Sequence, residues 1–247
     1  VDAHTRAMKF CKPGIYEYQR QAEIEHEFQM SGANGPAYTS IVGGGANGCI
    51  LHYIENKDML KNGDLVLIDA GCEYEDYASD ITRTFPVNGK FSDEQAAIYD
   101  IVLKALKEAI DVTQPGTPYN KTNETTIRVI TEGLVELGLL KGDINDLIKA
   151  EAHREFYMHG AGHWLGLDVH DVGDYKIDGE WRIYEPGMVV TIEPGIYISP
   201  KNKKVDTKWR GIGVRIEDDI VITKTGNINL TSKVPKERNE IEKMMAK

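Results

Sequence analysis

The sequence has few cysteines and no long hydrophobic run. Its three cysteines, Cys11, Cys49 and Cys72, are widely spaced and include no CxxC pair, which disfavours a zinc ribbon, a thiol redox site and a disulfide framework. Reduced thiols of this kind are typical of the cytosol, so we expect a cytoplasmic protein. The longest apolar runs, such as Val189–Ile192, are far too short to cross a bilayer, and the chain opens on no signal-like segment. No contact with a membrane is therefore predicted.

Positive charge is scarce relative to negative charge. The chain has 29 Lys and Arg against 39 Asp and Glu, a net charge of −10, so no nucleic-acid partner is expected. Hydrophobic residues make up 41% of the 247 residues, which is enough for a sizeable core. Because no low-complexity linker divides the chain, residues 1–247 are predicted to form one domain of the α+β class.

Hydrophobic periodicity predicts a mixture of helices and short strands. Ser92 and Gln95 form a capping box that opens a helix running to about Val112. Leu65–Ile68 is apolar without alternation, which is typical of a buried strand. The other predicted helices span 16–30, 119–137, 144–152 and 237–247, and the other β segments span 41–42, 50–53, 80–85, 188–192, 196–198, 212–216 and 220–223.

The sequence around Asp69 is echoed around Glu193, about half the chain later. Gly63–Gly71 (GDLVLIDAG) aligns with Gly187–Gly195 (GMVVTIEPG), and in both a strand-like run ends in a carboxylate with a glycine two residues on. Strand and turn patterns are repetitive, so a match of this length can also arise by chance. If it is a duplication, it predicts two related halves with a site between them.

Four carboxylates stand at the ends of predicted strands: Asp69, Asp80, Glu193 and Glu217. Each one alone has an ordinary explanation, such as a turn or an exposed strand end. A buried ionised carboxylate is costly, however, unless it is paired or binds a metal. A hairpin over the ten residues between Asp69 and Asp80 would bring those two acids together, and a cation would remove their repulsion. Because all four acids stand in similar strand contexts, two of them in the repeated segment, we expect them to converge on one cation site.

Charge balance favours two cations over one. One divalent ion would leave four clustered carboxylates with a net charge of about −2, whereas two ions and a bridging hydroxide leave about −1. Carboxylates can also bridge two ions about 3.5–4 Å apart. Oxygen-rich ligation with one imidazole suits Mn(II), Co(II) or Zn(II).

The imidazole is expected from Met158–Asp171 (MHGAGHWLGLDVHD), which contains His159, His163 and His170. A single histidine is more often structural than a ligand. Flanking glycines allow close backbone approach, and this favours a site. The segment is not an HExxH zinc helix, because Gly160 stands where the glutamate is needed.

Together these segments resemble the pita-bread metallopeptidases, a family that includes methionine aminopeptidase, prolidase, Xaa-Pro aminopeptidase and the metal-free creatinases. The matching motifs are LIDAG, SDITRTFPV, HGAGHWLGLDVHD, TIEPGIY and GVRIEDD, and the resemblance covers nearly the whole chain. Asn47–Tyr53 (NGCILHY), with His159 and His170 spaced about His163, is most similar to the bacterial Xaa-Pro aminopeptidase (aminopeptidase P) subfamily. The resemblance implies a pita-bread fold, in which two pseudo-symmetric halves share a curved antiparallel sheet flanked by helices.

The same resemblance implies the metal ligands and the reaction. Asp69 is expected on one divalent metal, His163 and Glu193 on the other, and Asp80 and Glu217 between them, with Mn(II) the expected ion. The implied activity removes the first residue from peptides with proline in second position, through attack by a hydroxide that bridges the two metals. Glu193 would carry the proton from the water to the leaving proline nitrogen.

Further residues receive roles only through the resemblance. His52 and His170 are expected to contact substrate and steady the oxyanion, and His159 to line the pocket for proline. Tyr197 and Arg215 would stand behind the ligands, with Arg215 offsetting their negative charge.

Full-length members of this subfamily carry an N-terminal domain that helps to assemble a tetramer and covers the active site. This chain begins at Val1 rather than Met and close to the catalytic segments, so we expect a piece of a longer protein that forms homo-oligomers when complete. Prolidase, which cleaves only Xaa-Pro dipeptides, is the nearest alternative. Methionine aminopeptidase and a non-catalytic peptide-binding module on the same fold are the others.

Overall fold

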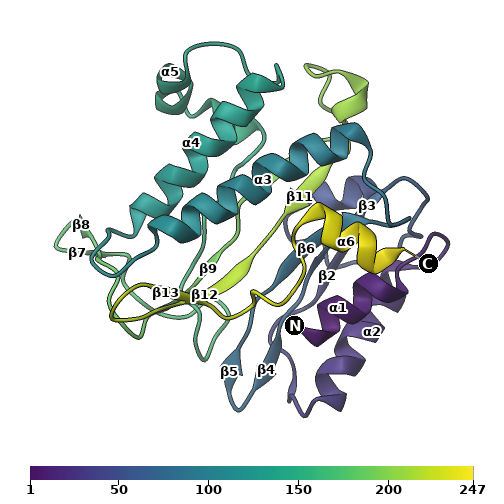
Figure 1. Cartoon of the computed structure of the whole chain (residues 1–247), viewed down its shortest axis with the longest axis horizontal. Coiled ribbons are helices and arrows are strands. Elements are labelled where there is room, and N and C mark those ends of the chain that lie inside the picture. Colours follow the sequence, from purple (N-terminus) through teal and green to yellow (C-terminus); the bar gives the residue numbers. More distant parts are fainter. Residues whose placement is uncertain (247) are drawn as a thin grey trace.

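The strands of each half of the chain form small antiparallel sheets. The computed structural model describes residues 1–246 and leaves Lys247 outside (Figure 1). In the first half, β3 (Leu65–Asp69) lies between β2 (Ile41–Gly44) and β6 (Thr82–Pro86). In the second half, β12 (Asp218–Ile222) lies between β9 (Val189–Ile192) and β13 (Asn227–Asn229), and β10 (Gly195–Tyr197) pairs with β11 (Gly213–Arg215). The remaining strands are β1 (Gly35–Pro36), β4 (Cys72–Tyr74), β5 (Tyr77–Ala78), β7 (Lys176–Ile177) and β8 (Glu180–Trp181).

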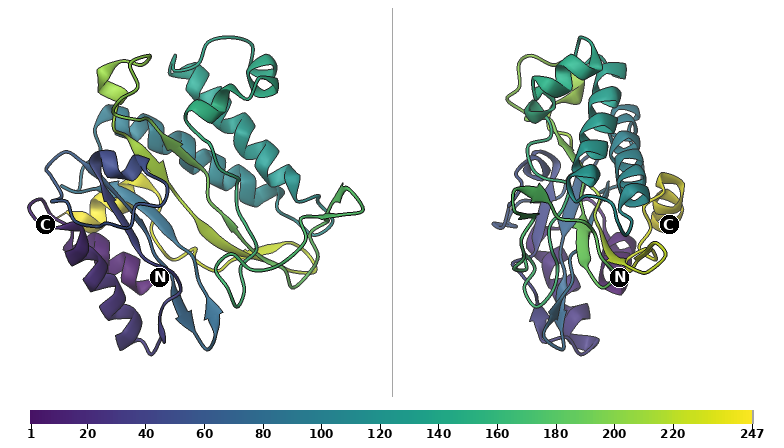
Figure 2. Two further views of the ribbon diagram at one scale, coloured as in Figure 1. Left: turned by 180° about the vertical axis from the view of Figure 1, so that it is seen from behind. Right: turned by 90° about the vertical axis from the view of Figure 1, so that its left-hand side faces the viewer.

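Two pairs of packed helices accompany the strands. The first pair is α1 (Asp2–Phe10) with α2 (Glu17–Met30), and the second is α3 (Asp93–Val112) with α4 (Asn120–Glu136). The right-hand view of Figure 2 shows the strands as a layer with α3 and α4 along one face. The chain adds α5 (Ile144–Lys149) beside α4 and α6 (Arg238–Met245) beside α1. This arrangement confirms the predicted α+β class with antiparallel sheet and flanking helices.

Most of the predicted elements are present with small shifts at their ends. The capping box is confirmed: the hydroxyl of Ser92 accepts a hydrogen bond from the backbone N–H of Gln95, and the Gln95 side chain accepts one from the N–H of Ser92. The predicted helix over 237–247 corresponds to α6, with its last residue outside the described part of the chain.

The β segment predicted over 50–53 is wrong. A 3₁₀ turn, Gly45–Cys49, precedes it, and residues 50–53 continue in turns. Gly45 has φ of +54°, which turns the chain out of β2, and a Cβ on Gly213 would clash with the carbonyl oxygen of Gly48. Because these glycines lack a side chain, the segment after β2 turns away and packs closely against β11, and it does not continue β2 as a strand. Helix α1 was not predicted at all.

The strand register places Asp69, Glu193 and Glu217 at or next to the ends of paired strands. Asp69 ends β3 opposite Thr82 of β6, and Ile192 ends β9 opposite Asp218 of β12. Glu193 and Glu217 are the next residues out from that second pair. The backbone N–H of Glu217 donates to the carbonyl oxygen of Thr82 at 3.0 Å, so the two halves are joined where their carboxylates lie.

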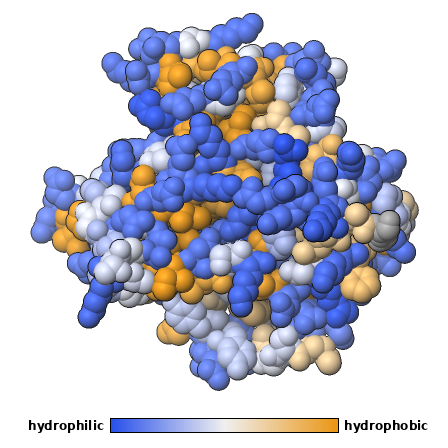
Figure 3. Space-filling model, viewed as in Figure 1, coloured by the Kyte–Doolittle hydropathy of each residue, from blue (hydrophilic) through white to orange (hydrophobic). Residues whose placement is uncertain are grey.

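The face drawn in Figure 3 is mostly hydrophilic, with apolar residues concentrated in the grooves between elements. Within residues 1–246, no helix combines the length and the apolar character that a membrane span requires.

Helix α1 is fixed to the first sheet through a buried histidine. His4 is 1% exposed, and its Nε2 lies 2.8 Å from the carbonyl oxygen of Ala70, directly after Asp69. Nε2 must therefore carry the proton and donate it. Nδ1 is buried with no hydrogen-bond partner, so a second proton there would place an unpaired charge in the core. Burial accordingly lowers the pKa of His4 to about 3.

Because the pKa of His4 is lowered by burial, we expect the free energy of unfolding to depend on pH. Below its ordinary pKa of about 6.5, the unfolded chain binds a proton at His4 that the folded chain does not bind until near pH 3. Stability is thus lost as the pH falls from about 7 towards 3. The His4 contribution should fall by about 2 kcal/mol between pH 8 and pH 5.

The measurement is the free energy of unfolding in urea with chelator present, at both pH values. His4→Gln retains a donor for Ala70 and should remove this part of the pH dependence, while the exposed His26→Gln should retain it. Equal pH slopes in the wild type and His4→Gln would contradict the assignment.

Candidate metal centre

One cavity of about 230 Å³ gathers almost all of the residues predicted to form the site. Leu51 joins them in its wall. The predicted residues that line it are His52, Asp69, Asp80, His159, His163, His170, Glu193, Arg215 and Glu217. Tyr197 stands behind the lining, where its hydroxyl lies 2.8 Å from Nε2 of His159. A larger cavity, of about 440 Å³, lies beyond Gly160–Gly162 and has aromatic walls without clustered acids.

Three potential ligands lie closest together. One ligand atom each from Asp80, His163 and Glu217 lies within 4.8 Å of the others. Nε2 of His163 is 3.4 Å from Oδ2 of Asp80 and 3.8 Å from Oε1 of Glu193. Nδ1 of the same ring lies 3.0 Å from the carbonyl oxygen of Trp164, which holds a proton on Nδ1 and aims Nε2 at the carboxylates.

Asp69 is connected to this group through two polar side chains. The hydroxyl oxygen of Tyr38 lies 2.6 Å from Oδ1 of Asp69 and 2.5 Å from Oδ1 of Asp80, so its single proton serves two carboxylates. Nη2 of Arg215 donates to Oδ2 of Asp69 at 2.6 Å. Each oxygen of Asp69 therefore has a donor on the protein side.

Glu217 is buried to 1% exposure and is held from the first half of the chain. The hydroxyl of Thr82 donates to its Oε2 at 2.6 Å, and Nε of Arg215 donates to the Thr82 hydroxyl at 3.2 Å. Nη1 of Arg215 donates to the hydroxyl of Tyr197 at 3.0 Å. Arg215 thus connects the two halves directly beneath the cavity.

The clustered acids disturb one another's ionisation. Burial, followed by the charge of Asp69, raises the pKa of Asp80 to about 6. Burial raises the pKa of Glu193 to about 7, with a contribution from Asp80, and raises that of Glu217 well above its ordinary value. Burial alone would lower the pKa of His163, but the Asp80 carboxylate and the charge of Glu193 raise it to about 9. The side chains by themselves therefore do not balance the negative charge.

This donor set fits divalent metal ions. It offers carboxylate oxygens and one imidazole nitrogen at short range, and a positive charge at the centre would stabilise the ionised form of each acid. Asp69, Asp80, His163, Glu193 and Glu217 are the residues that would hold the ions.

The histidines reach the cavity from one backbone segment beside β9. The N–H of Glu193 donates to the carbonyl oxygen of Ala161 at 2.8 Å. The N–H of Thr191 donates to the carbonyl oxygen of His163 at 2.9 Å. A Cβ on Gly162 would clash with the carbonyl oxygen of Thr191, so this close pairing requires glycine. The segment places His159 3.7 Å from Glu193 and the ring centroid of His170 4.1 Å from that of His163.

Sequence reasoning missed two side chains that donate hydrogen bonds to the candidate ligand carboxylates, Tyr38 and Thr82. Thr82 stands in the SDITRTFPV motif, and its position two residues after Asp80 was the available signal. Tyr38 lies in a loop between β1 and β2 with no motif of its own, so only the three-dimensional structure reveals it.

Comparison with known proteins identifies the family. The model of metallopeptidase family M24 matches residues 1–224. The chain belongs to metallopeptidase family M24. Membership implies a divalent metal cofactor, in agreement with the donor set of the cavity.

Relatives within this family are similar over nearly the whole chain. The Xaa-Pro aminopeptidase of Escherichia coli (strain K12) is 58% identical over 243 residues, 98% of this chain and 55% of the relative. Human Xaa-Pro aminopeptidase 3 is 40% identical, with 98% of this chain and 47% of the relative covered. The M24 chain described here thus spans about half the length of these relatives.

Solved structures give the same result for the fold. The Pseudomonas aeruginosa aminopeptidase PepP superimposes with a TM-score of 0.98 at 61% identity, covering 99% of this chain and 55% of that one. A single-residue variant of Escherichia coli aminopeptidase P in complex with substrate has a TM-score of 0.96 at 58% identity and the coverages 99% and 55%. These matches confirm the pita-bread fold for this member of family M24.

The close pairing of Gly162 with Thr191 predicts different outcomes for two neighbouring glycines. Gly162→Ala should force the histidine segment away from β9, lowering the free energy of unfolding by about 1–3 kcal/mol and weakening Mn(II) binding. Gly160→Ala meets nothing closer than 4.0 Å and should leave both quantities near the wild type. Chemical denaturation and calorimetric Mn(II) titration measure them. Equal effects from the two substitutions would refute the steric argument.

Proposed function

We propose that this chain is the catalytic domain, residues 1–247, of an aminopeptidase that removes the first residue from peptides whose second residue is proline. The observation that carries the proposal is the convergence of Asp69, Asp80, His163, Glu193 and Glu217 on one cavity. The printed names of its relatives, Xaa-Pro aminopeptidase and aminopeptidase P, support the substrate class. We also propose Mn(II) as the ion, because oxygen donors dominate the set.

The metal ions, when bound, would supply a hydroxide nucleophile at neutral pH and polarise the scissile carbonyl. We assign Asp80 and Glu217 to both ions because each lies within reach of His163 and of the other. Asp69, held by Tyr38 and Arg215, would bind one ion, and His163 with Glu193, which lie 3.8 Å apart, would bind the other. Two ions in place of one would compensate the four carboxylates more fully.

Glu193 is placed to move the proton. Its Oε1 faces His163 and its Oε2 faces His159, so the carboxylate lies at the edge of the ligand group with one oxygen towards the histidines of the substrate side. A carboxylate in this position can accept a proton from the nucleophilic water and deliver it to the leaving proline nitrogen.

The remaining histidines are assigned to the substrate. His52 and His170 line the cavity from different segments and would donate to the peptide oxygen that gains charge in the transition state. His159, hydrogen-bonded to Tyr197 and in edge contact with Tyr157, would form the wall of the proline pocket. Burial and the neighbouring Arg215 lower the pKa of His159 to about 4, so it presents an uncharged ring to an apolar residue.

The complete protein would work as a homo-oligomer in the cytoplasm on peptides. The wide spacing of the three cysteines, with no CxxC pair, supports that compartment. Prolidase activity, restricted to Xaa-Pro dipeptides, is the second candidate, because the same ligand set serves it.

The substrate and metal assignments predict one set of assays. The chain should release glycine from Gly-Pro-Ala. It should lose this activity when a chelator removes the metal ions and recover it when Mn(II) is added back. Mass spectrometry of the products measures the cleavage, with Gly-Pro and Met-Ala-Ser as competing substrates. Cleavage of Gly-Pro alone would assign a prolidase, and release of methionine from Met-Ala-Ser a methionine aminopeptidase. Fewer than one ion per chain after Mn(II) loading, without activity, would favour a binding module.

The proton-carrier role predicts the effect of a near-isosteric substitution. Glu193→Gln retains the size of the side chain and one oxygen but cannot carry a proton, so kcat should fall by about 10²–10⁴-fold. The exposed Glu180→Gln in β8 is the matched control and should retain full kcat. Steady-state kinetics with measured metal content decides the point. Near-normal kcat in Glu193→Gln with two ions bound would reject the role.

A further inference from the structure

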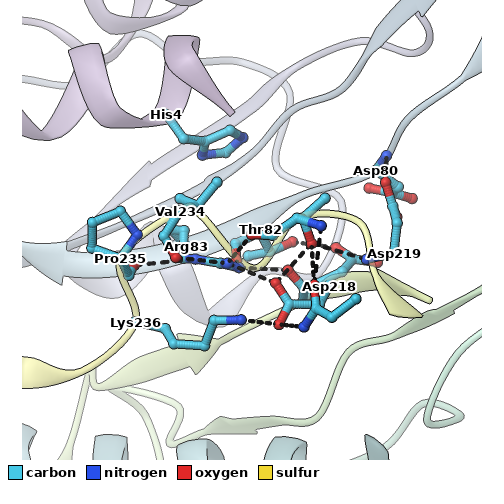
Figure 4. Close-up of polar contacts among 12 residues, drawn as sticks. His4, Asp80, Thr82, Arg83, Asp218, Asp219, Val234, Pro235 and Lys236 are labelled. Atoms are coloured by element: carbon cyan, nitrogen blue, oxygen red, sulfur yellow. Dashed lines mark hydrogen bonds and ion pairs between the residues drawn. The ribbon is translucent and has the colours of Figure 1, made fainter. Parts of the chain in front are cut away.

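Arg83 is a fully buried arginine that does not line the metal cavity. It lies in β6 with 0% exposure, next to Thr82 and on the opposite side of the strand from the candidate ligands. Figure 4 shows its guanidinium reaching into a group of backbone carbonyls contributed by distant parts of the chain. A buried guanidinium is tolerated only when its donors are used, so these contacts explain its presence.

All of the donor groups of Arg83 are in use. Its acceptors are the carbonyl oxygens of Thr82 (2.9 Å), Glu217 (2.5 Å), Thr231 (3.4 Å), Val234 (3.2 Å) and Pro235 (3.2 Å), and Oδ1 of Asp218 (2.6 Å). Five of these six acceptors lie more than 130 residues away in the sequence. A single side chain therefore ties β6 to the start of β12 and to residues 231–235.

Asp218 balances this charge from the other side. Its carboxylate is 0% exposed and accepts from Arg83, from the hydroxyl of Thr231 at 2.8 Å and from the amide of Asn229 at 2.7 Å. Lys236 also pairs with it. The guanidinium of Arg83 and the ammonium of Lys236 hold the pKa of Asp218 well below its ordinary value, although burial opposes this. The pair is thus fully charged and fully hydrogen-bonded.

One Arg83 contact falls on the backbone of the candidate ligand Glu217, and another falls on the backbone of Thr82, whose hydroxyl holds the Glu217 carboxylate. Nη1 donates both to the carbonyl oxygen of Glu217 and to that of Thr82. The Thr82 carbonyl also accepts from the N–H of Glu217 at 3.0 Å, and the Thr82 hydroxyl donates to the Glu217 carboxylate at 2.6 Å. Arg83 therefore fixes the backbone of Glu217 and the backbone of the residue that orients its side chain.

We propose that Arg83 is a positioning residue for the metal centre. It fixes the position of Glu217 by binding the backbone carbonyls of Thr82 and Glu217, and it is itself held by residues 231–235. This inference rests on the proposed role of Glu217 as a ligand. It gives the C-terminal segment, which contributes no side chain to the cavity lining, a part in metal binding.

The contacts of Arg83 depend on the planar guanidinium group, whose N–H donors point in several fixed directions. One guanidinium spans acceptors on three separate backbone segments, whereas an ammonium is a compact point charge that reaches fewer of them. Arg83→Lys preserves the charge facing Asp218 but should lose the bonds to Thr82 and Glu217. Changes in residues that orient metal ligands typically lower metal affinity by about 10–100-fold.

The test compares Mn(II) affinity and stoichiometry, measured by titration calorimetry, with the melting temperature of the metal-free chain. Arg83→Lys should raise the Mn(II) dissociation constant of at least one ion by about tenfold or more. The KM for Gly-Pro-Ala should change little, since Arg83 does not reach the cavity. Lys236→Met is the matched control: Lys236 also binds Asp218 but makes no bond to Thr82 or Glu217, so its loss should lower the melting temperature and leave Mn(II) affinity within about twofold.

A second variant protects the test against misfolding. Arg83→Met combined with Asp218→Met removes both charges together and leaves neither unpaired, a change that buried ion pairs often tolerate. It should fold and show the same loss of Mn(II) affinity as Arg83→Lys. Wild-type Mn(II) affinity in either folded variant would overturn the proposal. Failure of both to fold would also overturn it, because Arg83 would then serve the fold and not the site.

Glu217→Gln separates this inference from the proposed function. If Glu217 is a ligand, this substitution should weaken the binding of both ions. Wild-type Mn(II) binding by Glu217→Gln would reject the ligand assignment itself. Weakened binding by Glu217→Gln together with wild-type binding by Arg83→Lys would reject only the role of Arg83.

Discussion

Repulsion among buried carboxylates is the constraint on which the rest of this structure depends. Asp80, Glu193 and Glu217 share a small cavity with Asp69, and burial together with their mutual charge raises the pKa of the first three. The cost of burying such groups is offset only where each oxygen meets a donor or a cation. The surrounding residues divide accordingly: donors occupy the protein side of the acids, and the cavity side is left to metal ions.

The donors behind the acids form successive layers. Tyr38, Thr82 and Arg215 contact the carboxylates directly, and each contact is 2.5–2.6 Å long. Arg83 lies one layer further out, where it binds the backbone that carries Thr82 and Glu217. Each layer restricts the one inside it, so the ligand carboxylates are oriented by hydrogen bonds from two successive layers.

The sequence predicted the parts of this arrangement that leave a pattern along the chain. Strands ending in an acid and the Ser92 capping box are local signals, and each produced a correct element. The glycine-flanked histidines are a further local signal, and they line the same cavity as the acids. Tyr38 has no such signal, because its role depends on where a loop passes in space. The prediction for residues 50–53 failed because it rested only on the strand propensity of that segment. The close approach of Gly48 to Gly213, which the local sequence does not show, sets the conformation instead.

The two halves of the chain satisfy each other's acids. Arg215, from the second half, donates to Asp69 of the first, whereas Thr82, from the first, donates to Glu217 of the second. Arg83 likewise reaches from β6 to Asp218 and the carbonyl of Glu217. Without the other half, Asp69 would therefore lose the donor Arg215, Glu217 would lose the donor Thr82, and Arg83 would lose most of its acceptors. The contacts that hold the candidate ligands are therefore also contacts that join the two halves, which explains how a cluster of repelling charges can persist inside the fold.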